Sequence, residues 1–206
     1  MKSPTSHFPA IHLELPTWVA DYLSKASEQT RTPEQRMAFV VSLARMNIQH
    51  GSGGPFAAAV FRLDTHALVV PGVNLVVPSR CSVAHAEIMA LMLAEQIVGS
   101  HDLGVTESPG YELVTSCEPC AMCLGAIVWS GVRQVVCGAR ESDASDIGFD
   151  EGPKPAQWTT TLRQRGITII QDIQRGEARQ VLQDYARGNG VMYNGRQGVS
   201  QPPWTQ

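Results

Sequence analysis

Residues 116–129 read SCEPCAMCLGAIVW, and they hold three of the chain's five cysteines at a spacing of three. Cys117, Cys120 and Cys123 cannot all pair with one another, and neighbours on one helical turn are poorly placed to form a disulfide. A metal is the better explanation, because thiolates are good zinc ligands. Two thiolates still leave a zinc site incomplete, so further ligands must come from elsewhere in the chain.

Length, composition and charge set the outer limits. The chain has 206 residues, of which 43% are hydrophobic, so one globular core of ordinary size is expected. A net charge of −3 makes a nucleic-acid partner unlikely and gives no reason to expect a membrane surface. There is no apolar run of transmembrane length, and residues 1–16 lack the pattern of a signal peptide. Five cysteines without a secretory signal predict reduced thiols and a cytoplasmic location.

Hydrophobic periodicity and turn residues divide the chain into alternating elements. Helices are predicted at residues 17–27, 33–50, 84–98, 119–129 and 176–188, the second of them capped by Thr32 with Pro33 behind it. Residues 56–63 and 67–77 are predicted to form a β-hairpin, and further strands are predicted at 111–116, 132–139 and 166–173. Residues 141–155 are predicted to be a loop. This order indicates a three-layer α/β/α fold around a mixed sheet of about five strands.

The predicted helix starts give the cysteines a setting. Pro119 stands where a helix can begin, which puts Cys120 and Cys123 one turn apart on the same face. A helix N-terminus favours thiolates. Another predicted helix carries His85 and Glu87 near its own start. If the two starts lie side by side, His85 completes a set of three ligands with one open position, which is the catalytic zinc pattern, and Glu87 can act as a base on the water there.

The two motifs together resemble a known signature. His-Ala-Glu at residues 85–87 followed by Pro-Cys-Ala-Met-Cys at residues 119–123 is similar to the pattern of the zinc-dependent cytidine deaminase superfamily. The resemblance covers about residues 33–173 and implies a cytidine-deaminase-like fold with one Zn²⁺ per chain, bound by His85, Cys120 and Cys123. It gives Glu87 the catalytic proton transfers and gives Cys117 no ligand role. Family members commonly form dimers, so a homodimer is expected.

Simpler interpretations exist for each motif alone. A C-x-x-C pair is also compatible with a redox site or half of a structural zinc site, and a single histidine is more often a surface or capping residue. The occurrence of both motifs with Glu87 between the ligands favours the catalytic metal. Cys81 and Cys137 stand outside both motifs and are predicted to be small core residues.

Four local features resemble guanine deaminases within this superfamily. The stretch GGPF at residues 53–56 implies that Phe56 lines the base pocket, and Asn74 matches an asparagine that hydrogen-bonds the substrate. Trp129 ends the zinc-binding block, where editors of transfer RNA usually carry a histidine. The stretch SDIGFDEGP at residues 145–153 implies a second catalytic acid at Glu151, where the family uses an aspartate.

Each of these positions also has a structural interpretation. Phe56 is compatible with an ordinary core residue, and Asn74 with a turn residue. Trp129 can simply close the end of a helix. Asp150 and Glu151 can belong to a solvated acidic loop.

The resemblance implies hydrolytic deamination of guanine to xanthine and ammonia, by attack of zinc-activated hydroxide on C2 of the ring. Glu87 would pass a proton to N3 and Glu151 would help to protonate the departing amine. The backbone N–H groups near Ala86 and Cys120 would orient the attacking oxygen. Three rivals are a deaminase of a cytosine compound or aminotriazine, a transfer-RNA adenosine deaminase, and a non-catalytic zinc-binding module.

The predicted domain organisation has three parts. Residues 1–32 form a helical extension beyond a minimal deaminase, and residues 33–187 form the catalytic domain. Residues 188–206 form a tail rich in Gly, Gln and Pro that carries Tyr193 and Trp204 and is a candidate cover for the active site.

Overall fold

A computed structural model describes residues 11–25, 30–104 and 110–195 of the chain. Within these residues, five strands form one sheet in the order β2-β1-β3-β4-β5. The first three strands pair antiparallel, whereas β3, β4 and β5 run parallel, so the predicted mixed sheet is confirmed. The strands are β1 (Ala57–Arg62), β2 (Leu68–Val73), β3 (Tyr111–Cys117), β4 (Gln134–Ala139) and β5 (Thr168–Ile170).

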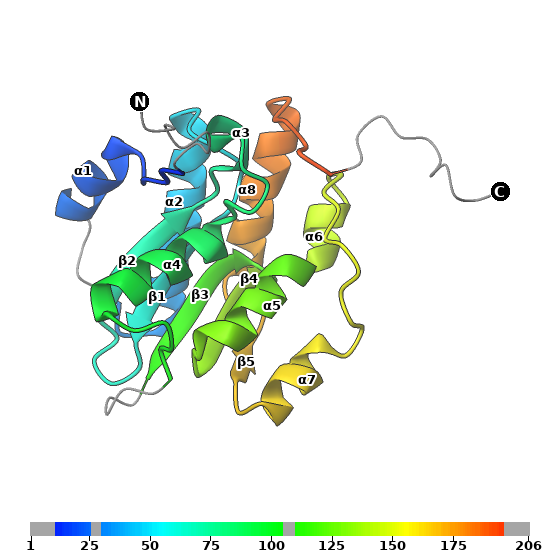
Figure 1. The fold of residues 1–206 in the computed structure, drawn as a ribbon. Coiled ribbons are helices and arrows are strands. Elements are labelled where there is room, and N and C mark those ends of the chain that lie inside the picture. Colours follow the sequence, from blue (N-terminus) through cyan, green and yellow to red (C-terminus); the bar gives the residue numbers. More distant parts are fainter. Residues whose placement is uncertain (1–10, 26–29, 105–109, 196–206) are drawn as a thin grey trace, which may run out of the picture.

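Helices cover both faces of the sheet, which gives the predicted three layers. Figure 1 shows α4 and α5 on one face and α2 and α8 on the other, and each face has its own cluster of buried side chains. The helices are α1 (Thr17–Lys25), α2 (Pro33–Gln49), α3 (Val76–Ser79), α4 (Ala86–Val98), α5 (Ala121–Ser130), α6 (Glu141–Ser145), α7 (Trp158–Gln164) and α8 (Arg175–Arg187). No helix in the described part of the chain is long and apolar enough to cross a membrane.

The start of α2 follows from its sequence. The Thr32 hydroxyl accepts a hydrogen bond from the backbone N–H of Gln35, and the Gln35 side chain accepts one from the backbone N–H of Thr32. This reciprocal cap satisfies two donors that the first turn leaves free, and Pro33 needs no donor at its position. The predicted start of this helix is therefore confirmed.

Helix α7 was not predicted, and several predicted boundaries differ by a few residues; three of the differences lie near the site. The strand predicted at residues 67–77 ends at Val73, because the Asn74 side chain accepts from the backbone N–H of Val76 and turns the chain into α3. The helix expected to open at Pro119 begins two residues later, after Cys120 as N-cap. The predicted loop at residues 141–155 contains the short helix α6, whose Asp143 carboxylate accepts from the backbone N–H of Arg140.

The described part of the N-terminal extension packs on the α2 side of the sheet. Val19 of α1 is buried in the core cluster of that face, and the Trp18 ring stacks on His50 with ring centroids 5.1 Å apart. The extension thus contributes to the same core as the domain that follows it. The last residues of its predicted helix, 26–27, lie outside the described residues.

Candidate active site

Two helix N-termini meet at one end of the sheet and bring the predicted ligands together. His85 is the N-cap of α4, Cys120 is the N-cap of α5, and Cys123 lies in the first turn of α5. Neither N-cap side chain forms a capping hydrogen bond, so both side chains are free to face each other. The Nδ1 atom of His85 lies 3.6 Å from the Cys120 Sγ and 3.7 Å from the Cys123 Sγ.

These distances fit a zinc ion. The usual Zn–S and Zn–N bond lengths place nitrogen and sulfur about 3.6 Å apart in a tetrahedral site. All three donor atoms lie within 4.8 Å of one another, and they form the one such group of His, Cys, Asp or Glu side chains in the described residues. His85, Cys120 and Cys123 are therefore a candidate zinc site, as the sequence predicted. Three protein ligands leave the fourth position for water or substrate.

A cavity of about 170 Å³ opens beside the donor set. It is much smaller than the roughly 300–1,000 Å³ pockets of drug-sized ligands, so it suits one small ring system. The residues that line it are Phe56, Ser82, His85, Glu87, Cys117, Glu118, Cys120, Phe149, Asp150, Glu151, Tyr193, Asn194 and Gly195.

Two carboxyl groups share this cavity. Glu87 is 7% exposed, and burial raises its pKa above the ordinary value. Burial raises the pKa of Glu151 to about 8, and the negative charges of Cys120 and Glu87 act in the same direction. The backbone carbonyl of Glu151 accepts a hydrogen bond of 2.9 Å from the N–H of Ala121 at the start of α5. Buried acids with raised pKa values beside a metal site are suited to proton transfer near neutral pH.

Aromatic rings form one wall of the cavity. Phe149 meets Phe56 edge to face and also contacts Tyr193, with centroid distances of 5.0 Å in both pairs. The Tyr193 ring lies 6.4 Å from the imidazole of His85. The predicted pocket position of Phe56 agrees with this geometry. A flat aromatic ring bound here would find apolar faces to pack against.

The C-terminal tail reaches the cavity of its own chain. Asn194 accepts from the backbone N–H of Asp150 at 2.9 Å and donates to the carbonyl of Gly148 at 2.7 Å. These two bonds attach the tail to the loop that carries Glu151, beside the cavity lined by Tyr193. The sequence pattern indicated Tyr193 but not Asn194. The rest of the proposed cover, residues 196–206 with Trp204, lies outside the described residues.

Two predicted substrate contacts lie just behind the cavity wall. Asn74 is fully buried, and its backbone N–H donates to the carbonyl of Phe56 at 3.0 Å. Its side-chain oxygen accepts from Val76 at 3.2 Å, whereas its Nδ2 has no hydrogen-bond partner. Ala86 is also fully buried and directly follows the ligand His85. Neither residue lines the cavity itself.

Trp129 does not reach the cavity. It lies near the C-terminal end of α5, its side chain is 84% exposed, and the cavity is formed at the opposite end of that helix. The prediction that Trp129 stacks on a bound ring is therefore wrong. A helix rises about 1.5 Å per residue, so Trp129 lies far along α5 from the first turn that faces the cavity.

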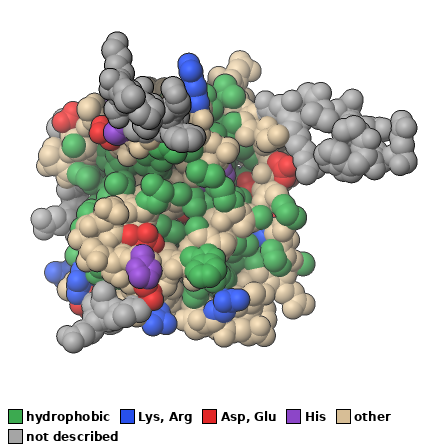
Figure 2. Space-filling model, viewed as in Figure 1, with side chains coloured by type: hydrophobic (Ala, Val, Ile, Leu, Met, Phe, Trp, Pro, Cys, Tyr) green, Lys and Arg blue, Asp and Glu red, His purple; other side chains and the backbone are tan. Residues whose placement is uncertain are grey.

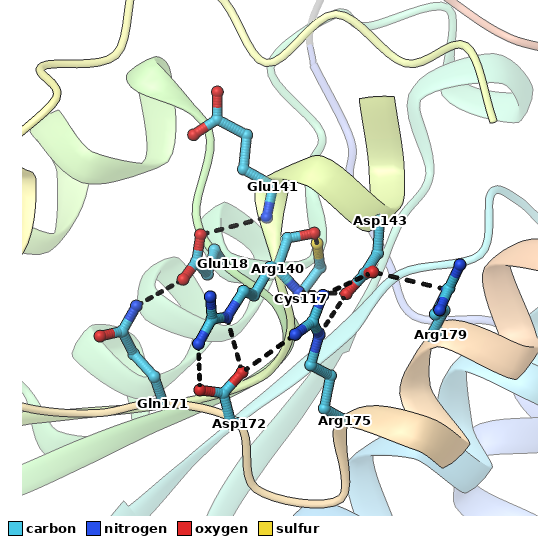
Figure 3. Close-up of polar contacts among 9 residues, drawn as sticks. All are labelled: Cys117, Glu118, Arg140, Glu141, Asp143, Gln171, Asp172, Arg175 and Arg179. Atoms are coloured by element: carbon cyan, nitrogen blue, oxygen red, sulfur yellow. Dashed lines mark hydrogen bonds and ion pairs between the residues drawn. The ribbon is translucent and has the colours of Figure 1, made fainter. Parts of the chain in front are cut away.

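A buried glutamate missed by sequence reasoning supports the floor of the cavity. Glu118 accepts hydrogen bonds from Gln171 and from the backbone N–H of Glu141, as Figure 3 shows. The ammonium group of Lys154 lies 3.5 Å from the same carboxylate and is only 2% exposed. The position of Glu118 between Cys117 and Cys120 was the only sequence signal for a role near the site. Its partners are distant in sequence and could not be predicted.

The remaining cysteines behave as expected. The Cys117 thiol lines the cavity and points to the carbonyl of Arg140 at 3.5 Å, and Cys117 is not part of the ligand group. Cys137 is fully buried and Cys81 is half-buried. All five cysteines are unpaired.

Comparison with known families identifies the class. The model of the cytidine and deoxycytidylate deaminase zinc-binding region matches residues 30–139, which contain every predicted zinc ligand and Glu87. The chain belongs to this family of zinc-dependent deaminases. Its fold and its donor set are those the resemblance implied.

Within the family, several relatives are guanine deaminases. The guanine deaminase of Bacillus subtilis is 37% identical over 126 residues, which are 58% of this chain and 76% of that protein. A structure of guanine deaminase from Nitrosomonas europaea superposes with a TM-score of 0.82 at 46% identity, covering 88% of this chain and all of the other. A further structure, solved in complex with 2,6-diaminopurine, has a TM-score of 0.83 at 49% identity and covers 90% of this chain and 97% of that one.

Proposed function

We propose that this chain is a zinc-dependent guanine deaminase that converts guanine and water into xanthine and ammonia. The carrying observation is a second acid, the half-buried Glu151, in the same small cavity as Glu87 and the donor set of His85, Cys120 and Cys123. The identity of 37% to 49% with the guanine deaminase of Bacillus subtilis and with the protein bound to 2,6-diaminopurine supports the substrate.

The chain's own residues can carry the protons that the reaction needs. A zinc ion held by the donor set supplies Lewis-acid chemistry that activates water for attack on C2 of the ring. Glu87 then takes a proton from that water and delivers it to N3, so that negative charge does not build up on the ring. A bond forms from oxygen to C2. When the bond from C2 to the exocyclic nitrogen then breaks, the hydroxyl on C2 gives its remaining proton to Glu87 and becomes the carbonyl of xanthine, and proton exchange with solvent restores both carboxyl groups.

The leaving amine needs one more proton, which we assign to Glu151. Its pKa, raised to about 8 by burial and by the neighbouring negative charges, keeps the carboxyl protonated at neutral pH. A neutral carboxylic acid in the cavity is the appropriate donor to a departing amine. Two carboxyl groups in one site thus divide the proton transfers, and a single glutamate need not serve every step.

Recognition of the base uses the cavity walls. Phe56, Phe149 and Tyr193 offer apolar faces to a planar ring. The unpartnered Nδ2 of Asn74 is a donor for an acceptor atom on the far edge of a purine. We assign to the backbone N–H of Ala86, next to the ligand His85, the role of orienting the attacking oxygen.

A nucleic-acid substrate is disfavoured. Lys and Arg number 16 against 19 for Asp and Glu, so the chain lacks the basic excess of a protein that binds transfer RNA. Tyr193 and Asn194 also line the small cavity beside Glu151. The proposed substrate is therefore a free base, and the proposed reaction belongs to purine breakdown.

A substrate panel tests the proposal. Purified zinc-loaded protein is incubated with guanine, adenine, cytosine, cytidine and an aminotriazine, and released ammonia is measured for each. Guanine is expected to give the highest kcat/KM. Faster release from cytosine, cytidine or the aminotriazine would move the protein to another substrate within the family, and release from none of them would leave only a zinc-binding role.

An apolar face of the chain suggests how it assembles. Helix α5 has no charged residue, and an apolar helix of this kind is normally covered on all sides. Figure 2 shows hydrophobic side chains across the face that carries α4 and α5, and its exposed members include Met92, Ile97 and Trp129. A second copy of the chain is proposed to cover this face.

The five unpaired cysteines support a reducing, cytoplasmic location.

A further inference from the structure

A chain of buried and partly buried hydrogen bonds joins the N-terminal extension to the turn at Asn74 behind the cavity wall. The indole N–H of Trp18 in α1 donates to the hydroxyl of Ser52 at 2.9 Å, and this hydroxyl lies 2.8 Å from the side-chain oxygen of Asn47. The Asn47 amide in turn donates to the backbone carbonyl of Asn74 at 2.9 Å. Trp18 lies outside residues 30–139, the zinc-binding region of the family.

Asn47 uses its whole side chain in this network. It is fully buried in the last turn of α2, and its second amide hydrogen goes to the carbonyl of Gly54, also at 2.9 Å. One amide group therefore holds two separate segments, the loop at residues 53–56 and the turn after β2 that begins at Asn74. A buried amide with every donor and acceptor engaged fixes its neighbours in one arrangement.

The two segments are packed too closely for any side chain to separate them. A Cβ atom at Gly53 would lie 1.8 Å from the carbonyl oxygen of Asn74, so only glycine allows this approach. A Cβ at Gly54 would lie 2.5 Å from the hydroxyl of Tyr193, which lines the cavity. The position of the Asn47 amide thus sets the distance between the Asn74 turn and the wall formed by Phe56 and Tyr193.

Two buried polar groups in this region have no partner among the described residues, the Tyr193 hydroxyl and the Asn74 amide nitrogen, and the amide nitrogen is a donor only. The Asn74 side chain accepts from Val76, but its buried Nδ2 has no partner among the described residues. An unpartnered buried donor is costly unless a ligand completes it. Both amide hydrogens of Asn47 have acceptors, whereas the amide of Asn74 has none. This is the arrangement expected when Asn47 holds the backbone in place and Asn74 binds the substrate.

We infer that Asn47 and Ser52, secured by Trp18, are positioning residues for the substrate: they fix the backbone at Asn74 so that its free amide meets the bound base. The inference rests on the proposed function, because it requires Asn74 to contact the substrate. It also gives the extension before residue 30 a task in binding. A purely structural network would instead affect stability and leave the affinity for substrate unchanged.

The test compares single variants that keep the fold. Ser52→Ala removes the bridging hydroxyl, and Trp18→Phe removes the indole N–H and part of the ring while an aromatic ring stays beside His50. Each is expected to lower kcat/KM for guanine about tenfold, mostly through KM, as for one lost buried hydrogen bond. Ser130→Ala is the matched control, because Ser130 is also buried and donates to the carbonyl of Ile127 far from the cavity. It should leave both constants unchanged.

A double-mutant cycle with Asn74→Ala decides how the network acts. If Ser52 works through Asn74, Ser52→Ala has no further effect on kcat/KM once Asn74 is alanine. Independent, additive losses in the double variant would overturn the inference, and so would normal KM values in both Ser52→Ala and Trp18→Phe. Unchanged guanine turnover in Asn74→Ala itself would instead refute the assigned role of Asn74 in the proposed function.

Discussion

At the scale of single residues, the site depends on where two glutamates lie. Glu87 follows a ligand on α4, and Glu151 comes from a loop whose backbone is bonded to the start of α5. Burial raises the pKa of both carboxyl groups. The negative charge of Glu87 contributes to the raised pKa of Glu151, and both residues line the same cavity.

Removing the acid from position 87 separates metal binding from catalysis. Glu87→Gln keeps the size of the side chain, and residue 87 is not one of the proposed zinc ligands, so zinc content and fold should stay normal. Turnover of guanine should fall about a hundredfold or more, the usual contribution of a positioned general base. Metal analysis and steady-state kinetics on the same preparation give the answer. Near-normal turnover would show that another group transfers the proton.

The pKa of Glu151 predicts how the reaction depends on pH. An acid with a pKa of about 8 donates its proton below that pH and loses this ability as the pH rises through it. The wild-type kcat should therefore fall above about pH 8. Glu151→Gln should lower kcat far more than it raises KM, and it should remove this alkaline decline. An unchanged profile in Glu151→Gln would make Glu151 a bystander.

Two neighbouring cysteines allow a matched pair of variants that tests which of them binds the metal. Cys120→Ala deletes a ligand and should lose most of the bound zinc. Cys117→Ala removes a cavity thiol that bonds only the carbonyl of Arg140 and should retain about one zinc per chain. Zinc bound per mole of purified protein distinguishes the two variants. Loss in the Cys117 variant with retention in the Cys120 variant would overturn the ligand assignment.

At the scale of elements, capping and local turns decide which helices could be foreseen. The start of α2 was predictable because its cap is encoded within four residues, from Thr32 to Gln35. Helix α6 was missed although Asp143 caps it locally, because part of its stabilisation comes from remote partners. Figure 3 shows Arg175 of α8 reaching Asp143, at 2.8 Å, from a different part of the sequence. The turn at Asn74 was considered only as an alternative, since a run of β-branched residues outweighed one side-chain bond to Val76.

The tail is the element whose contact with the site can be tested by one substitution. Asn194→Ala removes both bonds to the loop at residues 148–150 and should weaken the hold on Glu151 and Tyr193. We expect kcat/KM for guanine to fall about tenfold, the effect of losing hydrogen bonds of ordinary strength. Zinc content should not change.

Gln180→Ala is the control for the tail, because Gln180 bonds only Asp184 on the exposed side of α8. Equal kinetics for wild type, Asn194→Ala and Gln180→Ala would mean that the tail contributes nothing to catalysis.

At the scale of the whole molecule, the sequence predicted the layers and the zinc site but not every neighbour of the site. Two spaced motifs located His85, Cys120 and Cys123, because each lies at a helix start that its own sequence marks. Glu118 and its partner Lys154 escaped notice, since their approach depends on the final packing of the chain. Trp129 was assigned to the cavity by resemblance, whereas its position on α5 points it to the outer surface.

That outer surface predicts a dimer. Wild-type protein should have twice the 22.3 kDa mass of one chain in light scattering at micromolar concentration. Trp129→Lys places a charge on the apolar face of α4 and α5 and should shift the protein to the monomer. Ile11→Lys changes another exposed hydrophobic residue outside these helices and should leave the dimer intact. A wild-type monomer would contradict the proposed assembly.

The central claim is that this chain removes the exocyclic amine of guanine with Glu87 as proton carrier. The most direct measurement follows the conversion of guanine to xanthine by zinc-loaded wild-type protein beside Glu87→Gln at neutral pH. The account predicts xanthine and ammonia in equal amounts from the wild type, and turnover lower by about a hundredfold or more in the variant. No xanthine from the wild-type protein, or equal rates for the two proteins, would contradict it.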